Sequence, residues 1–350
     1  MMGFLCDPVI AMSFVVRPVQ VDDLEALKTL VSNAGIGITS LAVDTETLRD
    51  KIQASLDSFE ASVDEPGDQR YVFVLEDLDD DSIVGMSAVR AAVGLREPFY
   101  SYRIGTIVHA SKALNVHSQF SALYLSNDYT GSTELTSLYV SPNSRGSRLG
   151  TLISKARLLF MAEFPDRFAE KVIAEIRGVS TDDGHSPFWD GLGKHFFSMD
   201  FPTADYLVGT GNKSFIAELM PKHPIYTLFL PVDAREVVRQ AHKESKAALG
   251  ILETEGFRYE GYVDIFDAGP TLECRRDRIL TVRSSLRGQA HIMGVLDAGQ
   301  KALISNTRVS DFRCCVANVL LDGTATVGIA SDTAKALRIG EAEPVRVRTL

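Results

Sequence analysis

A strand, a glycine-containing turn and a helix follow one another without a break near the middle of this 350-residue chain. Residues 135–140 (LTSLYV) favour a strand, and residues 141–150 (SPNSRGSRLG) supply a turn with two glycines and two arginines. Apolar residues then recur at helical spacing from Leu149 to Phe160. The polar residues of this helix are predicted on its opposite face: Ser154, Lys155 and Arg157. Such a turn offers backbone N–H groups and the positive end of a helix dipole, so it predicts a pyrophosphate site.

Predicted elements on both sides of this turn give an α/β order. Strands are predicted at residues 14–18, 71–75, 83–89 and 171–176, from their β-branched and aromatic residues. An acidic turn joins the second and third of these strands, which predicts a hairpin. Asp22 with Glu25 three residues later predicts the start of a helix after the first strand. The predicted order is therefore strand, helix, hairpin, strand, phosphate turn, helix, strand.

This order resembles the acyl-CoA-binding core of the GNAT superfamily of N-acetyltransferases, whose turn reads Gln/Arg-x-x-Gly-x-Gly/Ala. Arg145 and Gly150 match the outer positions, while Arg148 stands where the middle glycine is usual. The resemblance implies an α/β (α+β) fold, with a mixed sheet flanked by helices. It also implies an acyl-CoA co-substrate whose pyrophosphate binds at four residues of the turn: Arg145, Gly146, Ser147 and Gly150. For a pattern of six residues, an ordinary strand-to-helix turn is the alternative.

Longer strings are similar to the arginine N-succinyltransferase family. They lie in order between about residues 14 and 276: 93–100 (VGLREPFY), 108–112 (VHASK), 125–131 (LSNDYTG), 186–189 (SPFW), 215–226 (FIAELMPKHPIY) and 262–270 (YVDIFDAGP). This resemblance implies transfer of the succinyl group of succinyl-CoA to the α-amine of L-arginine, in arginine catabolism. Succinylation of ornithine or another basic amino acid is an alternative within the enzymes. A non-catalytic partner subunit is an alternative of another class.

The family resemblance also implies roles for two residues of the site, His242 and Leu138. It implies that His242 is the catalytic proton donor, although Lys243 replaces the proline that normally follows this histidine. An imidazole suits this work because its ordinary pKa lies near the working pH. Without the resemblance, His242 reads as a solvated loop residue. The resemblance further implies that Leu138 binds succinyl-CoA, and an apolar residue can do so through its backbone N–H as an oxyanion donor.

Composition excludes several classes of protein. The formal net charge of −10 argues against a nucleic-acid-binding surface. The apolar opening residues lack a preceding basic residue and are too short to span a membrane, so neither a signal peptide nor an anchor is expected. The four cysteines have no metal-ligand spacing, which favours a reduced, cytoplasmic protein without a metal.

Four segments are expected along the chain. Residues 1–11 are predicted to be a disordered or mis-started extension, and residues 12–197 the GNAT-like lobe that binds acyl-CoA. Two helix-to-strand patterns, at residues 188–197 and 251–259, suggest a second acyltransferase-like half at residues 198–274 that carries His242; chance recurrence is the alternative. Residues 275–350 are predicted to form a small β-rich subdomain for packing or subunit contact. A homo-oligomer, or a hetero-oligomer with a paralogous subunit, is expected.

Other polar residues keep two interpretations each. Arg96 and Arg103 either hold the carboxylate of the succinyl group or form surface salt bridges. Asp264 and Asp267 either meet the guanidinium of arginine, whose planar fork pairs well with carboxylates, or cap strands.

Overall fold

The structure, a computed structural model, describes residues 13–32, 44–146, 148–181, 183–209, 218–296, 298–323 and 325–350. The strands are β1 (Phe14–Pro18), β2 (Arg70–Asp77), β3 (Ile83–Arg90), β4 (Ser101–Ser111), β5 (Val116–Ser126), β6 (Thr133–Val140), β7 (Lys171–Glu175), β8 (Ile225–Tyr226), β9 (Arg258–Val263), β10 (Pro270–Arg275), β11 (Leu286–Met293), β12 (Gln300–Asn306), β13 (Cys314–Leu321), β14 (Thr326–Ala330) and β15 (Pro344–Thr349). The predicted extension at residues 1–11 lies outside the described residues.

The helices are α1 (Leu24–Ser32), α2 (Thr45–Glu60), α3 (Leu149–Glu163), α4 (Lys194–Phe197), α5 (Phe201–Gly209), α7 (Val232–Val237), α8 (Lys246–Thr254), α9 (Leu280–Ser284) and α10 (Ser331–Leu337). A short 3-10 turn, η6 (Lys243–Ser245), leads directly into α8. None of the helices formed by the described residues has the length and apolarity that a bilayer crossing requires.

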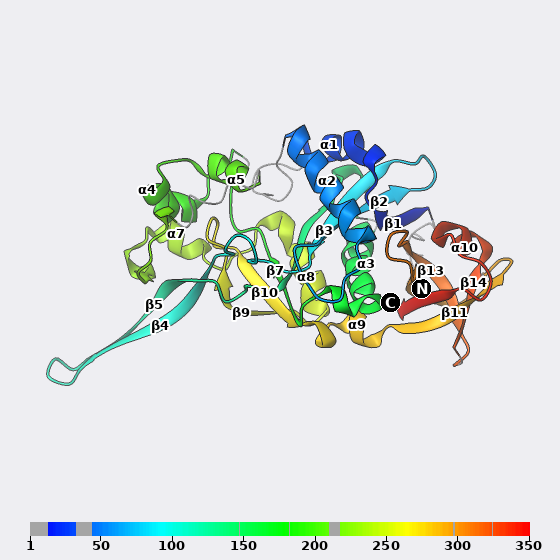
Figure 1. Cartoon of the computed structure of the whole chain (residues 1–350). Coiled ribbons are helices and arrows are strands. Elements are labelled where there is room, and N and C mark those ends of the chain that lie inside the picture. The colour runs from blue at the N-terminus through cyan, green and yellow to red at the C-terminus, as the bar shows by residue number, and fades with distance from the viewer. Residues whose placement is uncertain are drawn as a thin grey trace, which may run out of the picture.

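The described strands form one mixed sheet in the order β12-β15-β11-β14-β13-β1-β2-β3-β6-β7-β10-β9-β4-β5-β8 (Figure 1). The strands predicted around the turn are present as β1, β2, β3, β6 and β7, and β2 and β3 form the predicted antiparallel hairpin. The predicted first helix is present as α1, and a 3-10 turn, η1 (Val21–Asp23), leads into it. The capping contact lies at the start of this turn, where the Asp23 carboxylate accepts from the backbone N–H of Gln20 at 2.7 Å, and not at Asp22 and Glu25. The predicted α/β class, with a mixed sheet flanked by helices, is confirmed.

The sheet opens between β6 and β7. These two strands are parallel and pair only at Thr133 with Val172 and at Glu134 with Ile173. On the other edge of β6, the pairing with β3 shifts register between Met86 and Ala88, which leaves two β6 residues opposite one β3 residue. One of them, Ser137, has a φ of 56°. This is a β-bulge, which bends β6 away from β7 and opens a gap in the sheet.

Helix α3 lies at the centre of the hydrophobic core. Its Phe160 packs against aromatic rings of the sheet and of the C-terminal segment, among them Phe73 and Phe312. Ser154 and Arg157, predicted on the face opposite the apolar residues, are buried as well. The reason is that α3 contacts β3 and β6 on one side and α8, α9, β12 and β13 on others, which leaves little of the helix in solvent.

The C-terminal strands close on themselves. The chain of neighbours β12-β15-β11-β14-β13 returns to its start, because β12 also pairs with β13. This part of the chain consists mainly of the strands β11 to β15, with α10 between β14 and β15. The small barrel is fixed to α3, since Glu163 at the end of that helix binds Arg346 and Arg287. It therefore packs against the helix that follows the phosphate turn.

The two helix-to-strand patterns have different structures. The pattern at residues 251–259 is real: α8 ends near Gly256, whose φ is 100°, and β9 follows. The pattern at residues 188–197 is wrong, since α4 leads through Ser198 into α5 and no strand follows it. Strands β9 and β10 extend the sheet beside β7, so residues 198–274 add to the sheet of the preceding lobe.

Candidate active site

The turn between β6 and α3 provides an open, left-handed backbone. Gly146 has a φ of 92°, and a Cβ added at Gly146 or Gly150 would meet no atom of the chain within 4 Å. Arg148 also takes a left-handed conformation, with a φ of 61°. This explains why glycine is usual at its position, because other residues adopt that conformation at a cost. Ser147, the remaining residue predicted to bind the cofactor, lies outside the described residues.

Arg145 joins this turn to the segment that carries His242. Its Nε donates to the carbonyl oxygen of Val140 at 3.2 Å, and its guanidinium lies over the ring of Tyr139, 5.8 Å from the centroid. A terminal nitrogen lies 3.8 Å from a carboxylate oxygen of Glu244, two residues after His242. The turn at Arg145 and the segment at His242 and Glu244 are thus neighbours at the start of α3, although they lie about 100 residues apart in the sequence.

Leu138 lies at the bulge of β6. Neither Ser137 nor Leu138 has a partner residue in the described pairings of β6 with β3 or β7. The bulge is held by Arg157, which donates to the carbonyl oxygens of Ala88 at 3.4 Å and Thr136 at 3.2 Å. Burial lowers the pKa of this guanidinium to about 9, and no carboxylate forms an ion pair with it among the described residues. The arrangement suits a backbone donor that points out of the sheet.

His242 is buried, with 4% of the residue exposed, so its interpretation as a solvated loop histidine is wrong. Its backbone N–H donates to the carbonyl oxygen of Arg177 at 2.8 Å, directly after β7. Its Nδ1 accepts a hydrogen bond from the backbone N–H of Glu244 at 3.3 Å and so caps η6. His242 is not among the residues that line the cavity, but Glu244 and Ser245, which follow it closely in the chain, line it.

A single cavity of about 960 Å³ joins these parts through the gap in the sheet. Arg145, Gly146 and Gly150 line it on the α3 side, together with the start of α8. Leu138 and Tyr139 line it where the sheet opens, and residues of α1 and α2 line it on the opposite side. The structure thus brings all the described residues of the predicted cofactor site into one cavity, which Glu244, two residues after His242, also lines.

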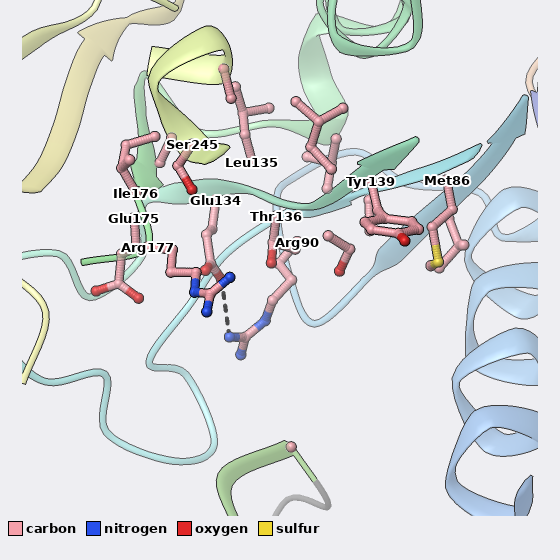
Figure 2. A pocket seen from close by; sticks show the side chains of 18 of the residues that line it. Met86, Arg90, Glu134, Leu135, Thr136, Tyr139, Glu175, Ile176, Arg177 and Ser245 are labelled. Atoms are coloured by element: carbon pink, nitrogen blue, oxygen red, sulfur yellow. Dashed lines mark hydrogen bonds and ion pairs between the residues drawn. The ribbon is translucent and has the colours of Figure 1, made fainter. Parts of the chain in front are cut away.

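Charged residues that sequence reasoning missed line the part of the cavity opposite α3. Arg90 on β3 and Glu134 on β6 are cross-strand neighbours, and their side chains form an ion pair at 3.1 Å. Figure 2 shows both side chains, with Glu175 and Arg177 from the end of β7, facing the same hollow, while Leu135 points to the other side of the sheet. The available signal was the lone charged residue in each of two otherwise uncharged strands, Arg90 in β3 and Glu134 in β6.

Asp264 and Asp267 lie in the loop between β9 and β10 and also line this cavity. Asp267 accepts from the backbone N–H groups of Gly178 at 2.6 Å and Gly269 at 2.8 Å, and Asp264 accepts from Phe266 at 2.6 Å. Both carboxylates therefore cap backbone groups, the second of their two interpretations. Burial raises the pKa of each aspartate. The pKa of Asp267 rises well above its ordinary value because of this burial and, second, because of the neighbouring charge of Asp264.

Arg96 and Arg103 do not line the cavity. Arg96 forms an ion pair with Asp68, and 83% of its side chain is exposed. Arg103 is exposed on β4. The surface interpretation therefore fits both arginines.

Comparisons with known proteins show the family to which this chain belongs. A family model described as the arginine N-succinyltransferase beta subunit matches residues 14–281, and one described as the C-terminal domain of that subunit matches residues 289–349. An arginine N-succinyltransferase of Yersinia pestis (strain Pestoides F) is 44% identical over 342 residues, which cover 96% of this chain and 97% of that protein. One of Enterobacter sp. (strain 638) is 53% identical over 271 residues, covering 77% and 78%.

A solved structure extends the similarity to the fold. The arginine/ornithine succinyltransferase subunit AI from Pseudomonas aeruginosa matches with a TM-score of 0.88 and 39% identity, over 96% of this chain and 98% of that chain. The opened sheet, the turn and this match define the chain as an acyltransferase. It belongs to the arginine N-succinyltransferase family.

Proposed function

We propose that this chain transfers the succinyl group of succinyl-CoA to the α-amine of L-arginine. The observation that carries the proposal is the cavity that crosses the sheet between β6 and β7. Its α3 side has a turn suited to phosphates, and its opposite side is lined by charges suited to an amino acid. Family membership along nearly the whole chain supports the same reaction.

The donor lies on the α3 side in this proposal. The pyrophosphate binds the backbone of the turn at Gly146, Ser147 and Gly150, and the guanidinium of Arg145 pairs with a phosphate. The pantetheine arm runs into the gap, and the thioester oxygen accepts a hydrogen bond from the backbone N–H of Leu138. That N–H stabilises the negative charge that develops on the oxygen during attack.

Because the thioester is already activated, the protein has to supply only proton transfer for the reaction. The neutral α-amine forms the C–N bond with the thioester carbon, the C–S bond breaks, and the proton lost by nitrogen is balanced by one gained by sulfur. Because Nδ1 of His242 accepts a hydrogen bond from Glu244, the hydrogen of the neutral ring is on Nε2. We assign Nε2 as the donor to the leaving thiolate of coenzyme A.

The setting of the reaction is part of the same proposal. Succinyl-CoA and free arginine meet in the cytoplasm, so we place the enzyme there. The solved relative is called a subunit, which supports an oligomer made of copies of this chain or of this chain with a paralogue. Size measurement of the chain purified alone distinguishes these.

A thiol-release assay tests the proposed function. The chain purified alone, given succinyl-CoA and arginine, is expected to release coenzyme A and to form N-succinylarginine, identified by mass spectrometry. Ornithine in place of arginine ranks the two acceptors, since the solved relative is called an arginine/ornithine succinyltransferase. Absence of product from every basic amino acid, with a folded chain, contradicts the proposal and supports a non-catalytic subunit.

A further inference from the structure

We infer that Asp267 is a positioning residue for His242, because its carboxylate fixes the segment to which the backbone of the histidine is bonded. The inference rests on the proposed function, in which His242 is the proton donor. The contacts that carry it join three segments: residues 176–178 after β7, residues 239–242 before η6, and residues 264–269 between β9 and β10.

The backbone around His242 is held by the segment after β7. The N–H of His242 donates to the carbonyl oxygen of Arg177 at 2.8 Å. The neighbouring residues, Ala241 and Gly178, pair in an isolated antiparallel bridge. The place of the imidazole therefore depends on where the segment at residues 177–178 lies.

Asp267 fixes this segment against the loop between β9 and β10. One oxygen of its carboxylate accepts from the backbone N–H of Gly178 at 2.6 Å, and the other accepts from the N–H of Gly269 in its own loop at 2.8 Å. Only 6% of Asp267 is exposed. A buried N–H that loses its acceptor is costly, so the two segments are held together through this one side chain.

The backbones of the two segments are in direct contact. A Cβ added at Gly178 would lie 2.6 Å from a carboxylate oxygen of Asp267, and one added at Gly269 would lie 2.6 Å from the backbone nitrogen of Gly178. Cβ atoms do not approach other atoms so closely, so a side chain at either position would push the segments apart. The junction thus has room for the Asp267 carboxylate and for little else.

Backbone strain lies at the same junction. Arg239 and Ala268 both have left-handed conformations, with φ of 69° and 54°. The N–H of Arg239 donates to the carbonyl oxygen of Ala268 at 2.9 Å, which is a second link between the loop and the segment of His242. Such conformations are unfavourable for residues other than glycine and persist where the surroundings hold them. The junction is therefore held in one arrangement, as a proton donor that must meet its acceptor requires.

Three substitutions loosen the junction in different ways. Asp267→Ala removes both acceptors, and Asp267→Asn keeps one oxygen but replaces the other with an NH₂ group, which cannot accept. Gly178→Ala keeps the carboxylate and inserts a Cβ beside it. We expect kcat to fall about ten- to a hundredfold in Asp267→Ala and about tenfold in the other two. Affinity for succinyl-CoA and for arginine, measured by calorimetry, should stay within about threefold.

A double-mutant cycle separates positioning from a general structural role. In a chain that already carries His242→Asn, Asp267→Ala should lower kcat further by less than about threefold, because the group that it positions is gone. If the two losses multiply, Asp267 acts independently of His242, and the inference is overturned.

Nuclear magnetic resonance tests the inference without turnover. In a chain with isotope-labelled histidine, the signals of His242 are those absent from His242→Asn. Asp267→Ala should shift the ring nitrogen signals of His242, because the contact of its Nδ1 with the N–H of Glu244 changes when the segment moves. Shifted signals in a chain that forms no product would support the positioning and contradict only the proposed function.

Glu255→Gln is the matched control for Asp267→Asn. Glu255 is also a buried carboxylate that accepts from a backbone N–H of another segment, that of Thr281 at 2.7 Å. We expect it to leave kcat within about threefold and the His242 signals unchanged. Gly340→Ala is the control for Gly178→Ala, since a Cβ at Gly340 would meet no atom of the chain within 4 Å.

Unchanged His242 signals in folded Asp267→Ala and Gly178→Ala, with folding verified by thermal unfolding, overturn the inference. A loss of arginine affinity with unchanged His242 signals also overturns it, because Asp267 would then contact the substrate. If Asp267→Ala does not fold, Asp267→Asn and Gly178→Ala give the same readouts.

Discussion

His242 combines two roles that two substitutions separate. It caps η6 through Nδ1, which accepts from Glu244, and it is the proposed proton donor through Nε2. His242→Ala removes both roles. His242→Asn removes the titrating ring but supplies an amide oxygen near the position of Nδ1, and asparagine is among the best N-cap residues.

The two roles have different magnitudes. Loss of an N-cap costs about 1 kcal/mol of folding free energy. Loss of a general acid lowers turnover by about 10²- to 10⁴-fold. We therefore expect both variants to lose at least about a hundredfold in kcat, while only His242→Ala loses about 1 kcal/mol of stability.

Thiol release at saturating succinyl-CoA gives kcat, and urea unfolding gives stability. Calorimetry with succinyl-CoA is the control, and affinity should change little in either variant because the phosphate turn is intact. If His242→Asn keeps more than about a third of the wild-type kcat, His242 is not the proton donor. If both variants lose equal stability, the capping argument is wrong.

Three further predictions concern other parts of the site. Arg145→Ala is expected to weaken succinyl-CoA binding about tenfold by calorimetry, because a phosphate partner is lost, with kcat changed less than about threefold; unchanged affinity contradicts this. Arg157→Met is expected to lower kcat about a hundredfold, since Leu138 loses the support of the bulge, while affinity for coenzyme A stays within about threefold; full turnover contradicts that support. The raised pKa of Asp267 means that the folded chain holds this proton more tightly than the unfolded chain, so stability falls as pH rises above about 4 toward the raised value. The stability advantage of wild type over Asp267→Asn should therefore shrink between pH 4 and pH 7 in urea unfolding, and a constant difference counts against this linkage.

Local patterns predicted much of the fold. The β-rich runs that became β1, β2, β3 and β7 have strong strand residues and clear turn signals, and these act over a few residues. The turn between β6 and α3 was also predicted locally, since a strand, glycines and a helix start are adjacent in sequence. Arg148 takes a left-handed backbone conformation, which is the conformation that the glycine usual at this position adopts easily.

Contacts between distant segments account for what was missed. The burial of Ser154 and Arg157 was not predicted, because nothing local indicates that the C-terminal barrel and α8 cover α3. His242 read as exposed because its burial depends on Arg177, which is 65 residues earlier and bonds to its backbone. Arg90 and Glu134 are brought together only by the register of β3 with β6. Each of these features depends on contacts between segments that are distant in the sequence, and periodicity alone does not specify such contacts.

A crystal structure with a non-hydrolysable ketone analogue of succinyl-CoA tests the central claim most directly. We predict the pyrophosphate against the backbone of residues 146–150 and the ketone oxygen about 2.7–3.1 Å from the backbone nitrogen of Leu138. A ligand bound outside the gap between β6 and β7, or a ketone oxygen directed away from Leu138, contradicts it.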